Sequence, residues 1–99
     1  MSFAYHPRAL AELEHETSWY EHRQSGLGRE LAAVVDDAVR RIVLTPALFP
    51  IVPGRPRFHR VILHKFPFSL VYMLRDGNVV IVALAHAKKQ PGYWARRIP

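Results

Sequence analysis

The sequence contains no cysteine. Without this residue a disulfide framework, a thiolate nucleophile and a cysteine-ligated zinc ribbon are excluded. Long hydrophobic runs are also missing, since the longest is Val79–Ala85, far short of the roughly 20 apolar residues that a membrane-spanning helix needs. The first twenty residues carry Arg8 and three glutamates, which excludes the apolar core of a secretory signal. We therefore expect a cytoplasmic protein.

Acidic residues are nearly absent from the second half of the chain. Residues 50–99 carry nine basic side chains and one acidic one, Asp76, which gives a net charge of +8. Residues 1–49 carry five basic and seven acidic side chains, a net charge of −2. A basic half is typical of a polyanion partner, such as nucleic acid or a ribosome. An acidic protein or an anionic membrane would fit the same field, and simple solubility is a further explanation, but we expect no membrane partner.

The remaining composition is typical of one globular domain spanning residues 1–99. The chain has 99 residues, of which 49% are hydrophobic and 22% charged. Because a chain this short leaves about a third of its unfolded surface exposed after folding, we expect a fairly flat working surface rather than a deep pocket. The basic half has no pair of carboxylates, so a two-metal mechanism lacks ligands. We expect neither a metal nor a cofactor.

The spacing of apolar and turn residues predicts one strand, two helices and three further strands. Pro7 suits the first position of a helix, and glycines at 26 and 28 interrupt the helical pattern. Asp76-Gly77-Asn78 predicts a tight hairpin, because these residues accept a positive φ. The predicted ranges are a strand over 3–5, a helix over 7–24, a break over 25–28, a second helix with an apolar stripe over 27–42 that ends at 45–46, an extended connection over 46–56, and strands over 57–64, 68–74 and 79–87.

These elements predict a two-layer α+β fold. The N-terminal strand and an antiparallel helix hairpin should pack on one face of a small antiparallel β-sheet of about four strands. The other face is then left to solvent or to a partner. Residues 91–97 are expected to form one helical turn.

Several motifs occur together in this order along nearly the whole chain. They are Ala9-Leu10-Ala11-Glu12-Leu13, Trp19-Tyr20, Gly26-Leu27-Gly28, Phe66-Pro67-Phe68-Ser69-Leu70-Val71-Tyr72 and Ala85-His86-Ala87-Lys88-Lys89 with Pro91-Gly92-Tyr93-Trp94. In this combination they resemble the RelE/ParE superfamily of bacterial toxins. The resemblance implies the toxin of a type II toxin–antitoxin pair, which arrests growth and is neutralised by a cognate antitoxin, in a hetero-oligomer with it.

The resemblance implies two mechanisms for two branches of the superfamily. RelE-like members enter the ribosome and cut mRNA, whereas ParE-like members inhibit DNA gyrase. Ribosome-dependent members typically hold the scissile phosphate with an arginine two residues after the turn, and this sequence has Ser69 there. Because serine carries no charge to stabilise the transition state, the ParE-like branch is favoured. Arg57 or Arg60 could replace that arginine, so a ribosome-dependent endoribonuclease acting on mRNA remains the alternative.

Candidate site residues follow from these two readings. If the protein cuts RNA, the acid, base and cation are sought among His86, Lys88, Lys89 and Tyr93. The residues predicted to bind the target, whether gyrase or ribosome, are Arg55, Arg57, Arg60, His64, Lys65, Arg96 and Arg97. The residues predicted to contact the antitoxin are Trp19, Tyr20 and Trp94.

Each of these assignments has a structural alternative. His86 ends an apolar strand, where a hydrogen-bonded structural histidine is common, and Tyr93-Trp94 would equally cap the core against the sheet. Trp19-Tyr20 would serve as packing between helix and sheet. A third hypothesis is a basic module that binds nucleic acid without chemistry, and it predicts an affinity that falls steeply with salt.

Overall fold

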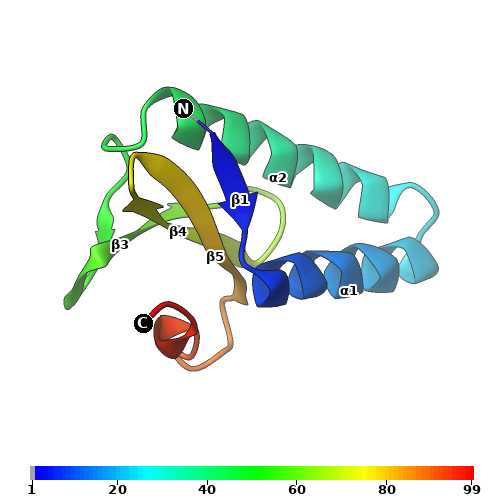
Figure 1. Cartoon of the computed structure of the whole chain (residues 1–99). Coiled ribbons are helices and arrows are strands. Elements are labelled where there is room, and N and C mark those ends of the chain that lie inside the picture. Colours follow the sequence, from blue (N-terminus) through cyan, green and yellow to red (C-terminus); the bar gives the residue numbers. More distant parts are fainter. Residues whose placement is uncertain (1) are drawn as a thin grey trace.

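A short strand leads into two long helices and then into a sheet in the computed structural model, which describes residues 2–99 (Figure 1). The elements are β1 (Phe3–Tyr5), α1 (Pro7–Arg23), α2 (Leu27–Leu44), β2 (Ile51–Val52), β3 (Arg55–Ile62), β4 (Phe68–Arg75), β5 (Asn78–His86) and a 3₁₀ turn, η1 (Ala95–Arg97). The strands lie in the order β1-β5-β4-β3-β2. Within residues 2–99 no helix is both long and apolar enough to cross a membrane.

The predicted α+β fold class is confirmed, with the helix pair packed on a small sheet. Two details of the sheet differ from the expectation. β1 runs parallel to β5, with Phe3 opposite Val79, so the sheet is mixed rather than wholly antiparallel. A fifth strand, β2, lies in the proline-rich connection at the sheet edge, where the missing N–H of proline does no harm. The apolar pattern predicts strands but not their partners, which explains both differences.

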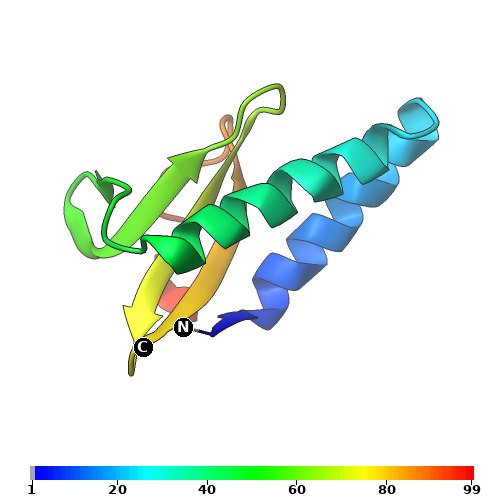
Figure 2. The ribbon, with the colours of Figure 1, turned by 90° about the horizontal axis from the view of Figure 1, so that it is seen from above.

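The two helices form the predicted antiparallel hairpin, which lies along the sheet (Figure 2). α2 begins already at Leu27, so the connection is shorter than expected. Its N-cap, Gly26, has a φ of 90° and no side chain to cap the helix, and the Glu21 carboxylate does so instead. That carboxylate accepts hydrogen bonds from the backbone N–H groups of Gly26 at 2.7 Å and Gly28 at 2.9 Å. These bonds, that of Gly26 above all, lower the pKa of Glu21.

The larger hydrophobic core fills the space between the helices and the sheet. Leu31, Val35 and Ile42 of α2 are fully buried against Tyr72 of β4 and Ile81 of β5. The Tyr72 hydroxyl donates a hydrogen bond to the carbonyl of Pro46, which joins the centre of the sheet to the end of the helix hairpin. The predicted apolar stripe of α2 is therefore its core face.

The opposite face of the sheet carries a second core, which corrects the expectation that this face is left to solvent or a partner. Trp94 and Ile98 of the C-terminal segment are buried against Phe58, Val71 and Met73. The predicted helical turn in this segment is present as η1. As the near-continuous apolar sequence of β5 predicts, this strand is buried on both faces.

Gly28 is the tightest point of the helix hairpin and gives a test of it. A Cβ at this position would lie 2.2 Å from the carbonyl oxygen of Thr17. Replacing Gly28 by alanine improves helix propensity, but the clash with backbone outweighs that gain, and we expect a net loss of about 1–3 kcal/mol. Urea unfolding measures the change. The exposed Ala33→Ser is the matched control, expected within about 0.5 kcal/mol of the parent, and an equally small effect at Gly28 would contradict the close packing.

Candidate functional site

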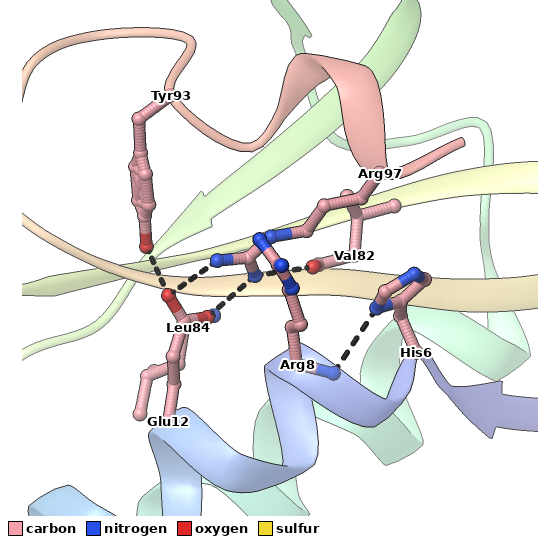
Figure 3. A network of polar contacts seen from close by, with 7 residues as sticks. All are labelled: His6, Arg8, Glu12, Val82, Leu84, Tyr93 and Arg97. Atoms are coloured by element: carbon pink, nitrogen blue, oxygen red, sulfur yellow. Dashed lines mark hydrogen bonds and ion pairs between the residues drawn. The ribbon is translucent and has the colours of Figure 1, made fainter. Parts of the chain in front are cut away.

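Glu12 of α1 is the centre of a network of polar contacts between the helix, the sheet and the C-terminal segment (Figure 3). Its Oε1 accepts hydrogen bonds from the backbone N–H of Leu84 at 3.1 Å and from Nη1 of Arg97 at 2.8 Å. Its Oε2 accepts from the Tyr93 hydroxyl at 2.5 Å and from Nη2 of Arg97 at 2.9 Å. Nη1 of Arg97 also donates to the carbonyl of Val82 at 3.0 Å. One carboxylate thus holds α1, β5 and the C-terminal segment together.

The network forms where β5 extends beyond its neighbour. β1 ends at Tyr5, opposite Ile81, whereas β5 continues to His86. Backbone groups on that edge would lack partners, and unpaired groups away from water are costly. The side chains of Glu12 and Arg97 supply them, and these side chains are only 20% and 12% exposed. Two side chains therefore take the place of the missing strand.

The network also sets the protonation of its members. Burial, together with the hydrogen bond to Glu12 and its charge, raises the pKa of Tyr93 far above its ordinary value. The hydrogen bond to Glu12 likewise raises the pKa of Arg97. The fold therefore favours a neutral phenol and a charged guanidinium beside the carboxylate.

Two arginines of β3 hold the C-terminal segment from the other side. The guanidinium of Arg55 lies 5.9 Å from the centre of the Trp94 ring and packs against Gly92, where a Cβ would come within 2.5 Å of its Nη2. Nη2 of Arg57 donates to the carbonyl of Pro99 at 3.3 Å. Both arginines are exposed, but part of each side chain contacts the C-terminal segment.

The seven residues predicted to bind the target are divided by the structure into two groups. Arg55, Arg57 and Arg97 contact the C-terminal segment as described, and Lys65 forms an ion pair with Glu30 of α2. The partly buried Arg97 is poorly placed for the predicted target contact. The other three of the seven, Arg60, His64 and Arg96, make no side-chain hydrogen bond or ion pair within residues 2–99.

The four catalytic candidates lie in or beside one turn, but they do not all face one space. Nδ1 of His86 accepts a hydrogen bond from the backbone N–H of Lys88 at 3.0 Å, which leaves Nε2 to carry the proton of the neutral ring. The Nζ of Lys89 lies 5.2 Å from the centre of the Tyr93 ring. The Tyr93 hydroxyl points to Glu12 and is held there with a raised pKa, so it is poorly suited to give up a proton.

A small hollow lies between the end of the sheet and the C-terminal segment. Arg60, Ser69, His86 and Lys89 line it together with Trp94 and four residues of the segment before it. Its volume is about 120 Å³, below the roughly 300 Å³ at which small-molecule pockets begin. No group of three acidic or histidine side chains within residues 2–99 is placed to hold a metal ion.

The three predicted antitoxin contacts differ in exposure. Trp94 is buried in the core beneath Phe58, with the two rings 4.7 Å apart, so its predicted surface role does not fit its position. Tyr20 packs edge-on against Phe66 at 5.2 Å and is only partly accessible. Trp19 is 46% exposed, with the guanidinium of Arg23 4.6 Å from its ring. Trp19 is the member of the set that a partner can reach.

Glu12 is the residue that the sequence analysis missed as part of this site. In the sequence it is one of three glutamates at alternate positions, 12, 14 and 16, and nothing local separates it from the other two. Only the packing of β5 beside α1 shows that Glu12 faces the sheet, where its carboxylate reaches the backbone of Leu84.

Comparison with known proteins supplies a family. Residues 3–91 match the sequence profile of a family described as the ParE toxin of the type II toxin–antitoxin system parDE. The fold is similar to a solved chain of a chromosomal ParDE toxin–antitoxin system from P. aeruginosa, with a TM-score of 0.65 and 16% identity over 89% of this chain and 97% of that one. The curated proteins include no match to the chain.

The raised tyrosine pKa values predict a loss of stability in alkali. Burial raises the pKa of Tyr72 to about 12, and that of Tyr93 rises further. Above an ordinary value of 10.0 the unfolded chain ionises these phenols and the folded chain does not. Stability is therefore full below about pH 10 and falls as the pH rises through the folded values. Tyr93→Phe should make this fall shallower, measured by urea unfolding between pH 8 and 11, and an unchanged slope would contradict the assignment.

Proposed function

Because the chain belongs to the ParE toxin family of type II toxin–antitoxin systems, we propose that it arrests growth in the cytoplasm by binding DNA gyrase. We further propose that a cognate antitoxin binds the protein and neutralises it. The observation that carries the proposal is the family match over residues 3–91. We propose that Arg96 and His64, whose side chains make no hydrogen bond or ion pair in the described part of the chain, contact the gyrase, and that the antitoxin contacts Trp19.

The side chains around the hollow support binding rather than cleavage. Ser69 lies there without a charge for a phosphate oxygen, and the C-terminal segment narrows the space below what a nucleotide occupies. Of the cations expected to stabilise a transition state, Arg57 instead holds the carbonyl of Pro99. A protein target needs only an exposed, complementary surface and no such cavity.

The antitoxin surface is proposed on the helix hairpin. Trp19 is exposed there, and a groove between α1 and α2 is lined by Leu13, Thr17, Gly28 and Ala32 among others. A segment that orders on binding would bury apolar side chains in such a groove. The expected product is a hetero-oligomer of toxin and antitoxin.

A second candidate function is a ribosome-dependent endoribonuclease. The observation in its favour is that His86, Lys89 and Arg60 line one hollow. In this mechanism His86 would be the base, Lys88 and Lys89 would stabilise charge, and the phosphate would be held by Arg60. Tyr93 would have to leave Glu12 to take part.

Two assays of the purified protein distinguish the two functions. We expect it to inhibit supercoiling by gyrase and to leave mRNA intact on translating ribosomes. Arg96→Glu should weaken gyrase inhibition about tenfold, because it reverses an exposed charge that steers encounter. The control is Arg75→Glu, another exposed arginine, at the end of β4, which should retain inhibition. Cutting of mRNA at ribosomal A-site codons with normal supercoiling would contradict the proposal and support the second candidate.

Salt separates the two proposed interfaces. Apolar contacts in the helix groove supply part of the antitoxin affinity, whereas contact with the target depends more on charge. We therefore expect the affinity for the antitoxin to fall less steeply with salt than the affinity for gyrase, when each is measured between about 50 and about 300 mM salt. Equal slopes would contradict an apolar antitoxin surface.

A further inference from the structure

We propose that Leu84, Tyr93 and Arg97 form a carboxylate-binding site whose resident ligand is the chain's own Glu12, and that this site is a latch for residues 87–99. The inference goes beyond the proposed function and does not depend on the identity of the target. It concerns how the C-terminal segment is kept on the sheet.

The receiving half of the site is complete without α1. The backbone N–H of Leu84, the hydroxyl of Tyr93 and both terminal nitrogens of Arg97 point to one place and donate four hydrogen bonds to two oxygens. Four donors match the acceptor capacity of an ionised carboxylate, and the two from arginine form the bidentate pair that such groups favour. All four donors come from β5 and the C-terminal segment, whereas the carboxylate comes from α1 (Figure 3). The ligand and the site therefore belong to separate parts of the chain.

The chain around the site allows the segment to open without unfolding the rest. Residues 87–91, which connect β5 to Tyr93, are all exposed. Trp94 and Ile98 belong to the second core, whereas Tyr72, Ile81 and the buried residues of α2 belong to the core under the helices. Release of residues 87–99 therefore leaves the helix-side core intact. An element that is joined to the rest by an exposed connection, and whose core is separate from the main one, can open locally once its polar contacts are lost.

Opening has a defined structural consequence. It takes Arg97 away from the carbonyl of Val82 and both Tyr93 and Arg97 away from Glu12, so part of the edge of β5 beyond Tyr5 loses its cover and only Leu84 N–H still binds the carboxylate. It also removes Gly92 and Trp94 from the wall of the hollow that contains Arg60 and His86. One carboxylate thus controls both the sheet edge and access to the basic face of the sheet.

The first test removes the ligand and leaves the site. In Glu12→Ala, exchange of the Leu84 amide should become about tenfold to a hundredfold faster, as expected for the loss of hydrogen bonds to a charged group. In a Trp19→Phe background, Trp94 emission reports on the segment alone and should shift to the red. The control is Glu14→Ala, an exposed glutamate two residues on whose side chain makes no hydrogen bond in the described part of the chain. In this control the Leu84 amide should exchange at the rate of the parent protein.

The second test supplies the ligand from solution. Sodium acetate should restore slow Leu84 exchange and the blue Trp94 emission in Glu12→Ala, while sodium chloride of equal ionic strength should not. Arg97→Ala, which destroys the site itself, should open the segment without responding to acetate. If the methylene groups of Glu12, and not its carboxylate, kept the segment docked, acetate would restore neither the slow exchange nor the blue emission.

Two outcomes of these tests would overturn the proposal. In one, Trp94 emission in Glu12→Ala stays at the wavelength of the parent, which means that the segment remains docked. In the other, the emission shifts to the red but acetate restores it no better than chloride does. If Glu12→Ala does not fold, native-state amide exchange of the unaltered protein decides. The latch predicts that amides of residues 93–97 exchange through a lower-energy opening than those of Tyr72 and Ile81, and a single common opening would overturn it.

Discussion

The carboxylate of Glu12 is the contact on which the arrangement of the rest depends. It reaches from α1 across the uncovered edge of β5 and fixes Tyr93 and Arg97 of the C-terminal segment. Because this segment is fixed, Trp94 and Ile98 can bury the second face of the sheet, and a 99-residue chain gains a second core. A buried carboxylate is costly unless it is fully hydrogen-bonded, and here every oxygen has two donors.

This arrangement changes the meaning of the strongly basic second half. Arg55 and Arg57 contact the C-terminal segment, Arg97 of that segment pairs with Glu12, and Lys65 pairs with Glu30. The net charge of +8 therefore overstates how many basic side chains of this half lack a partner within residues 2–99, and Arg96 is one that lacks one. The hollow beside Ser69 has a volume of only about 120 Å³.

The sequence predicts the elements well because their signals are local. Pro7, Gly26 and Asp76-Gly77-Asn78 mark ends and turns through their own backbone preferences, whereas Gly28 lies inside α2 and is required there by close packing. The parallel pairing of β1 with β5, the docked C-terminal segment and the role of Glu12 depend on groups more than 70 residues apart. Trp94 illustrates the difficulty, because a tryptophan near the end of a basic chain reads equally as a contact for a partner or as core.

A double-mutant cycle on Glu12→Ala and Arg97→Ala tests the central contact most directly. Unfolding free energies of the parent, both single variants and the double variant isolate the coupling between the two side chains. For a bidentate and largely buried pair we predict a coupling of about 2 kcal/mol. A value below about 0.5 kcal/mol, as is usual for exposed ion pairs, would contradict the account.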